Sequence, residues 1–421
     1  MFAVQRMARE TVRALHAAGL DLTAGARGLV IRYALGADSS AGINGITRMA
    51  RYLPGITVSL KGLDVNRDVL NVRNGTLDLQ TFTLGPHRPT EMLTRLVDVP
   101  YEPSATAPTW QKFLDEVFQH EPALIEFVQR CVGYTLTGSI KEQVVFFLHG
   151  AGSNGKSTFV DLLSTLLGDY STNAGKETFL ASRHNEGRGP EPELIAMSGK
   201  RFAHVDEADE GRLLDEGRIK SLTGGATYSG RDLYKSTETF DNTAKVWFDL
   251  NKLPGFTGID YGIERRLLVI PFDRTFHPEE KDLEMLDKLK AELPGILAWA
   301  VEGCRAWRQR DLSTDRPSQV SLATRRYRDE QNHLPAFIEE TYLLDPTGQI
   351  GSKQIQADYR GFCAQREEPP LEWREKVVPY LRDVRKLTSS HKKTGTVWQG
   401  LVPRQSVDEP GEPSWFKEGP L

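Results

Sequence analysis

Short apolar runs and amphipathic stretches succeed one another through the middle of the chain. Residues 144–148 (Val-Val-Phe-Phe-Leu) are uninterruptedly apolar, and residues 158–167 then carry apolar side chains at helical spacing. A run of this length is typical of a parallel strand, because both of its faces are covered by helices. Gly168 can end the helix, since glycine readily adopts the left-handed conformation found at helix C-termini. The pattern therefore predicts a strand, a loop and a helix in succession.

Three further segments have strand character, at residues 200–207, 245–250 and 267–270. Together with residues 144–148 they predict an α/β fold with a parallel sheet and flanking helices. Residues 109–138 lead into this sheet as a helical pair with aromatic stripes, which indicate core packing. We interpret residues 171–199, which are polar and rich in Pro and Gly, as loops around short helices. The central domain is placed at residues 106–310.

The first 105 residues predict a small α/β region. Helical periodicity covers about the first 19 residues and again residues 43–53. Asn74-Gly75 lies between two β-prone runs and predicts a hairpin with a two-residue turn, because a type I′ turn needs positive φ at both positions. A Pro-rich segment at residues 101–108 then forms a linker.

A second linker at residues 311–318 precedes a separate small domain at residues 318–406. Helical runs are expected at about residues 336–344, 352–365 and 371–387, followed by a short hairpin near Thr394–Trp398. Seven Lys and Arg residues fall between positions 374 and 393, against Glu375 and Asp383. Helices followed by a basic hairpin are typical of a winged-helix nucleic-acid module; the alternative is a solvated charged helix. Residues 407–421, rich in Pro, Glu and Gly, predict a disordered tail.

Composition narrows the function classes only slightly. The formal net charge of −4 gives no global basic field, so any nucleic-acid surface must be local. Three widely separated cysteines indicate neither a disulfide framework nor a zinc site, and they fit a reducing compartment. No run of about 18 apolar residues occurs, so no membrane span is expected.

The loop after the first strand carries the clearest chemistry. Gly150, Gly155, Lys156 and Ser157 match G-x-x-x-x-G-K-[ST], which binds nucleotide phosphates. Glycines let backbone N–H groups approach a phosphate chain, and the following helix N-terminus adds favourable charge. The lysine can reach the β- and γ-phosphates, and the serine hydroxyl can ligate Mg²⁺. We predict binding of ATP and Mg²⁺ by a phosphate loop whose remaining contacts are Gly152, Asn154 and Thr158.

Polar residues at the ends of the later strands complete a candidate hydrolytic site. Asp206 and Glu207 end the strand at residues 200–207; in phosphate-loop ATPases such acids hold Mg²⁺ through water and polarise the attacking water. Asn251 follows the next strand and can orient that water, although asparagine there is also an ordinary turn former. Arg265 and Arg266 can reach a neighbour's γ-phosphate, or form a surface feature.

Aromatic and basic residues alternate between the second and third of these strands. Tyr228, Arg231, Tyr234 and Lys235 surround Gly230 in a predicted hairpin. Such side chains can stack on bases and hold phosphates of a DNA strand. The alternative is a solvated hairpin with ordinary strand tyrosines.

In order and spacing, these motifs resemble the phage- and plasmid-type primase-helicases, whose motor is a superfamily 3 helicase of the AAA+ class akin to the poxvirus primase-helicase. The resemblance runs over most of the chain and rests on these segments: residues 71–79, 133–138, 152–157, 205–207, 220–225, 233–235, 251–254, 265–266 and 270–272. Residues 337–340 and 398–401 extend it to a family-like winged-helix region.

The resemblance implies an ATP-dependent DNA helicase of phage or plasmid replication in the cytoplasm of a bacterial host. It implies a homo-oligomeric ring, as a hexamer, with ATP between subunits and an arginine finger supplied by Arg265 or Arg266. Glu207 is then the water activator, Asn251 the polar sensor, and Tyr228 to Lys235 the DNA-contacting hairpin. The chain departs from the family in two ways. No primase domain fits before residue 71, so priming is not predicted for this chain; the activity is either lost or located on another chain. Ala226 stands where the family tends to have an acid.

Two other functions remain open from the sequence. A phosphate-loop kinase for a small molecule would need an acceptor pocket and no arginine from a neighbour. A nucleotide-gated protein that binds DNA or an origin would hydrolyse slowly and would not displace a strand.

Overall fold

The computed structural model describes most of the chain. The described ranges, apart from a few isolated positions before residue 62, are residues 24–37, 39–50, 62–181, 192–206, 213–231, 237–256, 261–331, 333–366, 370–392 and 395–404. The chain divides into two compact units, one formed by residues 1–65 and 89–94 and the other by residues 66–88 and 95–421. Among the described helices, none is both long enough and apolar enough to cross a membrane.

The first unit contains two described helices and one short turn. Helix α2 covers Ala24–Ala37 and α3 covers Ser40–Ala50, with a 3₁₀ turn at Pro89–Glu91. Ser39 joins the two helices, because its hydroxyl donates to the Gly36 carbonyl at 2.6 Å and accepts from the Gly42 N–H at 3.0 Å. The predicted helix at residues 43–53 is thus found as α3, shifted toward the N-terminus, whereas α2 was not anticipated.

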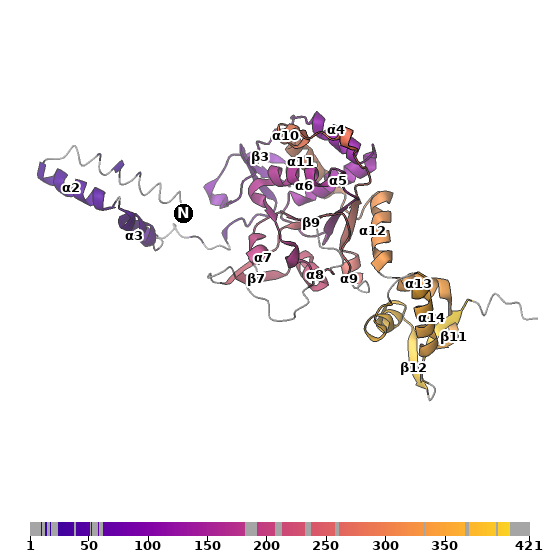
Figure 1. Ribbon diagram of the computed structural model, residues 1–421. Helices are drawn as coiled ribbons and strands as arrows, with labels where there is room; N and C mark the ends of the chain where they lie inside the picture. Colours follow the sequence, from indigo (N-terminus) through magenta and orange to yellow (C-terminus); the bar gives the residue numbers. More distant parts are fainter. Residues whose placement is uncertain are drawn as a thin grey trace, which may run out of the picture. The chain divides into compact units, whose positions relative to one another are not determined.

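A five-stranded parallel sheet forms the centre of the second unit (Figure 1). Its order is β10-β4-β9-β6-β5, with every neighbouring pair parallel. The strands are β4 (Val145–His149), β5 (Ser171–Asn173), β6 (Phe202–Val205), β9 (Lys245–Leu250) and β10 (Leu267–Pro271). The four strands expected from apolar runs are confirmed. The edge strand β5 was missed, because its three residues are polar.

Both faces of the sheet are covered by helices, which explains the uninterrupted apolar sequence of β4. Phe146 and Leu148 point into one core and Val145 and Phe147 into the other. Figure 1 shows α4, α5, α6, α10 and α11 on one side of β9, and α7 and α8 on the other. The helices are α4 (Pro108–Val117), α5 (Pro122–Thr135), α6 (Lys156–Leu167), α7 (Pro192–Ala196), α8 (Glu216–Gly224), α9 (Tyr261–Glu264), α10 (Met285–Lys290), α11 (Leu293–Gln309) and α12 (Ser318–Gln331). The short 3₁₀ turns are Gly168–Tyr170, Lys176–Thr178 and Pro278–Glu280.

A small antiparallel sheet precedes these helices in the second unit. It consists of β1 (Val69–Val72), β2 (Gly75–Asp78) and β3 (Thr83–Gly85). The predicted hairpin is confirmed, but Val72 pairs with Gly75, so the two turn residues are Arg73 and Asn74. The expectation of a turn at Asn74-Gly75 was one residue too late. The Asn74 side chain instead forms two hydrogen bonds with the Tyr101 backbone, at 2.9 and 3.0 Å, and these fix the loop.

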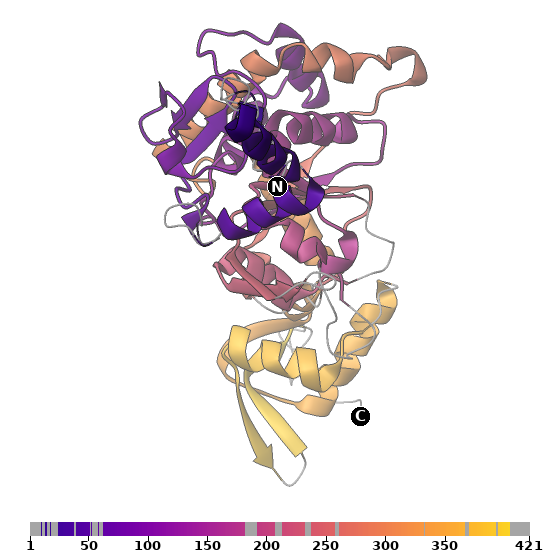
Figure 2. The same ribbon diagram turned by 90° about the vertical axis from the view of Figure 1, so that its left-hand side faces the viewer.

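The C-terminal module combines helices with a three-stranded antiparallel sheet of order β11-β13-β12. Its elements are α13 (Leu334–Thr341), β11 (Tyr342–Gly351), α14 (Ser352–Gln365), π-helical turns at Trp373–Val377 and Tyr380–Val384, β12 (Thr388–Lys392) and β13 (Gly395–Pro403). The predicted helix at residues 352–365 is confirmed. The helix expected to reach residue 344 ends at Thr341, and Tyr342 begins a strand. In Figure 2 the hairpin of β12 and β13 extends past the helices of the module.

Candidate functional site

The loop between β4 and α6 has the backbone geometry of an anion-binding turn. Gly155 caps α6 with φ of +86° and Gly152 has φ of +100°, both in the left-handed region that favours glycine. A Cβ on Gly155 would lie 2.8 Å from a Val117 methyl group, and one on Gly150 would lie 2.3 Å from the Phe272 carbonyl oxygen. The two motif glycines are therefore required both by conformation and by space. The N-terminus of the 12-residue helix α6 opens directly from this loop.

Lys156 is buried in the loop, with only 3% of its surface exposed. Its ammonium group donates to the Gly150 carbonyl at 2.9 Å and to the side-chain oxygens of Asn251 at 3.0 Å and Asn154 at 3.2 Å. The Asn251 contact joins the phosphate loop to the end of β9, which is the neighbour of β4. Two residues that the sequence analysis assigned to one site, Lys156 and Asn251, are thus in direct contact.

Asp249 also reaches this lysine, and the sequence analysis missed it. Its carboxylate accepts a hydrogen bond from the Ser157 hydroxyl at 2.9 Å and lies 3.7 Å from the Lys156 ammonium. Asp249 is the only charged residue in β9 after Lys245. A lone acid near the carboxyl end of an otherwise apolar strand was the available signal, because parallel strands next to a phosphate loop end at its edge.

The acidic strand end at β6 lies one strand farther from the phosphate loop. Asp206 directly follows β6 and accepts a hydrogen bond from the Asn173 amide at 2.8 Å. Asn173 belongs to β5, on the side of β6 away from β9. Asp206 is exposed, whereas Glu207 lies outside the described residues. The carboxyl edge of the sheet therefore collects Asp206, Asp249 and Asn251 around the loop.

The remaining loop residues divide into buried and accessible positions. Asn154 is buried and donates to the Phe272 carbonyl at 3.3 Å, so it braces the loop against the segment after β10. Ser157 is exposed and Thr158 is half-buried in the first turn of α6. Within the described ranges, no group of three or more His, Cys, Asp or Glu side chains is arranged to hold a metal ion. The donor set that fits Mg²⁺ here is a hydroxyl and a carboxylate, which leaves room for phosphate and water oxygens.

His149, at the end of β4, is a titratable group beside the loop. Burial lowers the pKa of His149 from its ordinary 6.5, and the Lys156 charge lowers it further, while Asp273 and Glu330 act in the opposite direction. The imidazole is therefore neutral at neutral pH. Because its pKa is depressed in the folded state, His149 contributes stability above pH 6.5 that is lost as the pH falls through the folded-state value.

We expect wild-type protein to lose thermal stability between about pH 7.5 and about pH 5.5 more steeply than the variant His149→Gln, which has no proton to gain. Melting temperatures of both proteins across this range measure the difference. His391, which is exposed, serves as the matched control site, and the variant His391→Gln should follow the wild-type curve. Parallel curves for wild type and His149→Gln would contradict a depressed pKa at His149.

The two arginines before β10 lie at the opposite edge of the sheet from the phosphate loop. The Val145 N–H donates to the Arg266 carbonyl at 2.8 Å, which fixes these arginines beside the start of β4. The five residues of β4 then separate them from the loop, a distance of roughly 16 Å at about 3.3 Å per residue. Neither side chain can therefore reach its own chain's phosphate loop.

The environments of the two arginines differ sharply. Arg266 is buried, with 8% of its surface exposed, and donates to the Thr223 hydroxyl at 2.8 Å, the Gly262 carbonyl and the Gln143 side chain at 3.5 Å. Arg265 is exposed. Of the two candidates for an arginine that acts on a neighbouring subunit, only Arg265 has a side chain directed to the surface. That one of the two arginines acts on a neighbouring subunit stays a prediction, and the exposure of its side chain favours Arg265.

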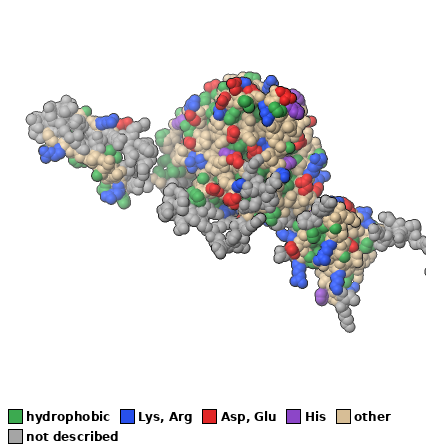
Figure 3. All heavy atoms as spheres, viewed as in Figure 1, with side chains coloured by type: hydrophobic (Ala, Val, Ile, Leu, Met, Phe, Trp, Pro, Cys, Tyr) green, Lys and Arg blue, Asp and Glu red, His purple; other side chains and the backbone are tan. Residues whose placement is uncertain are grey.

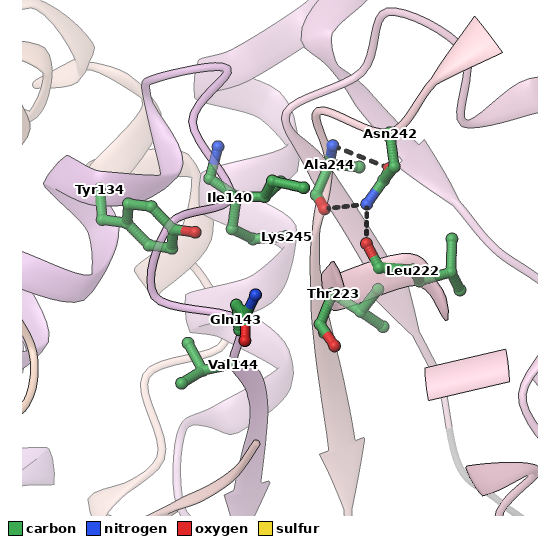
Figure 4. Close-up of a pocket in the computed structure, with 10 residues that line it drawn as sticks. Tyr134, Ile140, Gln143, Val144, Leu222, Thr223, Asn242, Ala244 and Lys245 are labelled. Carbon is green, nitrogen blue, oxygen red and sulfur yellow. Dashed lines mark hydrogen bonds between the residues drawn. The ribbon is translucent and has the colours of Figure 1, made fainter. Parts of the chain in front are cut away.

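A cavity at the same edge contains the structural partners of Arg266 (Figure 4). Gln143 and Thr223 line it, together with Tyr134 and the completely buried Lys245. Burial holds the pKa of Lys245 well below its usual range, and its ammonium donates to the Thr137 carbonyl and, at 3.1 Å, to the Thr243 carbonyl. The Asn242 side-chain amide donates hydrogen bonds to the Leu222 and Ala244 carbonyls, each at 3.0 Å. These hydrogen bonds hold the residues at this edge of the sheet in place, and we refer to this network as the scaffold.

Replacing Arg266 with alanine is expected to lower the free energy of unfolding by about 3 kcal/mol, because hydrogen bonds to a charged group are worth about 1.5–3 kcal/mol each and their partners become unsatisfied. The matched variant Arg265→Ala removes an exposed side chain and should change the free energy of unfolding by less than about 0.5 kcal/mol. Urea denaturation of both variants measures the difference. Equal losses would contradict the assignment of Arg266 to the scaffold.

The predicted DNA-contacting hairpin is only partly described. Strands β7 (Thr227–Arg231) and β8 (Thr237–Asp241) pair antiparallel, which confirms the hairpin. Tyr234 and Lys235, and the side chain of Arg231, lie outside the described residues. Tyr228 is 7% exposed and packs against Phe240, with ring centroids 5.9 Å apart. The Tyr228 ring thus belongs to the core beneath β7, and a contact of this ring with DNA bases stays a prediction.

Two family models match parts of the chain. One, described as D5 N terminal like, matches residues 3–119. The other, described as a family of unknown function (DUF5906), matches residues 148–266, which include the phosphate loop and end at Arg266. Among solved structures, the chain is similar to the apo structure of the NrS-1 C-terminal region, with a TM-score of 0.44 and 14% sequence identity. The match covers 73% of this chain and 78% of the NrS-1 chain.

Relatives of this chain are named as putative helicases and putative primases of viruses. "Putative helicase 022R" of Frog virus 3 is 27% identical over 71% of this chain and 31% of its own length. "Putative helicase L207/L206" of Acanthamoeba polyphaga mimivirus is 30% identical over 57% of this chain and 25% of its own length. "Putative primase C962R" of African swine fever virus is 24% identical over 53% of this chain and 24% of its own length. The chain thus spans about a quarter to a third of these relatives. The chain is therefore similar to the D5 N-terminal-like family model over residues 3–119 and, at low identity, to viral proteins named as putative helicases and primases.

Proposed function

We propose that the chain is the ATP-dependent motor of a DNA helicase of the superfamily 3, AAA+ type that acts in replication. The observation that carries this proposal is the phosphate loop, where Lys156 and Ser157 contact the polar end of β9. The names of the viral helicase and primase relatives support the choice of DNA as the substrate. A ring of identical subunits, as a hexamer, follows from the family resemblance.

In this proposal the loop backbone and the α6 N-terminus bind the phosphates of ATP, and Lys156 turns from its oxygen partners to the β- and γ-phosphates. Ser157 and Asp206 would hold Mg²⁺, which neutralises phosphate charge during transfer. Glu207 accepts the proton of the attacking water, and Asn251 orients that water. Lys156 and Ser157 begin α6, Asp206 directly follows β6 and Asn251 directly follows β9, so these four residues are attached to regular elements.

The arginine that completes the site comes from a second subunit. Arg265 is exposed at the amino edge of the sheet, roughly 16 Å from its own phosphate loop by the length of β4. An arginine finger stabilises the charge of the transferring phosphoryl group, and it acts in trans where its own site is out of reach. Hydrolysis then requires an assembled interface, and a lone chain is nearly inactive.

Two surfaces are proposed to contact DNA. The first is the β7–β8 hairpin through Arg231, Tyr234 and Lys235. The second is the C-terminal module, which we interpret as a winged helix because helices lead into a basic two-stranded hairpin. Figure 3 shows Lys and Arg side chains along this module, and among its described basic residues Arg374, Arg382, Lys386 and Lys392 are exposed.

ATP hydrolysis by the purified chain, with and without single-stranded DNA and across protein concentration, tests the proposal. A helicase motor with shared sites gives a rate per chain that rises with concentration and with DNA. Strand displacement from a forked duplex then separates a helicase from a nucleotide-gated DNA-binding protein. A rate per chain that ignores both concentration and DNA would overturn the proposal and favour a small-molecule kinase.

A further inference from the structure

Helix α12 is held against the edge strand β10, which is the neighbour of the strand that leads into the phosphate loop. Its residues Val320, Thr324 and Tyr327 recur at helical spacing and are buried, with at most 2% of their surface exposed. The Thr324 hydroxyl accepts a hydrogen bond from the Val269 N–H of β10 at 3.0 Å. The buried face of α12 therefore has a fixed position relative to this edge of the sheet.

Tyr327 brings a hydroxyl into the core beneath α12, and this hydroxyl has a specific acceptor. The ring packs against Phe147 of β4 and against Phe256, with ring centroids 5.7 and 5.2 Å apart. The hydroxyl donates to the Pro254 carbonyl at 2.6 Å. Burial raises the pKa of Tyr327, so the hydroxyl keeps its proton and remains a donor. Because a phenylalanine ring would fill the same space without burying a polar group, the hydrogen bond to Pro254 is what distinguishes tyrosine here.

The acceptor belongs to the segment that follows Asn251. Strand β9 ends at Leu250, and the Asn251 side chain accepts a hydrogen bond from the Lys156 ammonium at 3.0 Å. Pro254 is buried, so its carbonyl needs a donor within the protein. The three residue steps from Asn251 to Pro254 span at most about 10 Å when fully extended. A displacement of Pro254 is therefore transmitted to Asn251 through a short piece of chain.

Two further hydrogen bonds hold the residues after this proline. The Gly255 carbonyl accepts from the Leu214 N–H at 2.7 Å. The Phe256 N–H donates to the side-chain oxygen of Gln331 at 3.2 Å. Gln331 lies one turn beyond Tyr327 on α12, so the helix contacts the segment at two points. Residues 251–256 thus connect the phosphate loop at one end with α12 at the other.

We propose that Tyr327 is a positioning residue of the nucleotide site, which sets the place of Asn251 at the phosphate loop by holding Pro254. Tyr327 does not touch the nucleotide, and it acts only through Asn251. The inference rests on the proposed function, because it requires a nucleotide whose attacking water Asn251 orients. It deepens that function by making the rate at the site depend on α12.

The variant Tyr327→Phe removes the hydroxyl, keeps the ring and tests this role. We expect turnover of ATP to fall about tenfold, because a small displacement of an orienting group costs rate, while affinity for a fluorescent ADP analogue changes by less than about twofold. The matched control is Tyr342→Phe, which removes another buried hydroxyl, one that donates to Asp358 in the C-terminal module. This control should keep wild-type turnover and affinity.

A double-mutant cycle separates positioning from a general loss of packing. Asn251→Ala should lower turnover at least as far as Tyr327→Phe, and the double variant should lose little beyond Asn251→Ala, because both changes act on one group. Wild-type turnover in Tyr327→Phe, or losses that multiply in the double variant, would overturn the inference. Melting temperatures check folding. If Tyr327→Phe does not fold, Gln331→Ala, which removes the acceptor of the Phe256 N–H, takes its place in the same cycle.

Failure of the inference is distinguishable from failure of the proposed function. Wild-type protein that neither binds the ADP analogue nor hydrolyses ATP would remove the nucleotide site, and the inference with it. Wild-type protein that hydrolyses ATP, at a rate that Tyr327→Phe matches, would remove only the role of Tyr327 and leave the phosphate loop in place.

Discussion

Alanine in place of Lys156 is expected to abolish ATP hydrolysis, with a loss of at least about 10²–10³ in turnover, the usual effect of removing one charge-stabilising donor. The loss should be larger here than at an exposed site, because the ammonium is buried among Gly150, Asn251 and Asp249. Its removal also deletes the positive charge that lies 3.7 Å from the Asp249 carboxylate, which should weaken nucleotide binding. Turnover and ADP affinity, measured on the same preparations, check both effects.

Lys112 provides the matched control for this substitution. It lies on α4 with its side chain 77% exposed and 3.7 Å from Glu116, so Lys112→Ala should retain wild-type turnover. A melting temperature for Lys156→Ala close to that of the wild type would show that the fold persists. Unchanged turnover in a folded Lys156→Ala protein would contradict the assignment of the phosphate loop.

Alanine in place of Arg265 is expected to reduce turnover by about 10³–10⁵, the range found for arginine fingers, while leaving nucleotide affinity intact. The affinity is retained because Arg265 lies at the far edge of the sheet from its own loop. The loss of rate arises in the neighbouring subunit, whose transition state loses a positive charge. Steady-state hydrolysis and nucleotide titrations of Arg265→Ala separate the two quantities.

Mixing this variant with Lys156→Ala tests whether the arginine acts across an interface. A subunit with Arg265→Ala still has an intact phosphate loop, and a subunit with Lys156→Ala still has Arg265. Random pairing at equal ratio restores roughly one quarter of the interfaces, so activity should reappear in the mixture. Absence of rescue at every ratio would count against an arginine supplied by a neighbour.

The central architecture was predictable because burial on both faces leaves a strong pattern in the sequence. Strands β4, β6, β9 and β10 are almost wholly apolar and were located to within one or two residues. The phosphate loop was equally visible, since its glycines are needed for both backbone conformation and space. Local sequence determines such features, and no knowledge of distant contacts is required to find them.

Other features depend on contacts that a linear pattern does not contain. Asp249 lies beside the phosphate loop only because β9 lies between β4 and β6 in the sheet. The amino-acid composition of the strands does not determine this order. Tyr228 was expected at the surface, but the packing of β7 on the second core buries its ring. Arg265 and Arg266 are adjacent and identical in type, and only the fold gives one to the scaffold and the other to the surface.

The separation of the phosphate loop and Arg265 to opposite edges of one sheet has a consequence for symmetry. If each site combines the loop of one subunit with the arginine of the next, the contact joins two different surfaces and therefore has a direction. Two subunits in such a contact share one complete site and leave one loop and one arginine unpaired. Only closure of the array gives every subunit a working site, so an open array always lacks one. In a head-to-tail array, the sheet thus links catalytic completeness to closure.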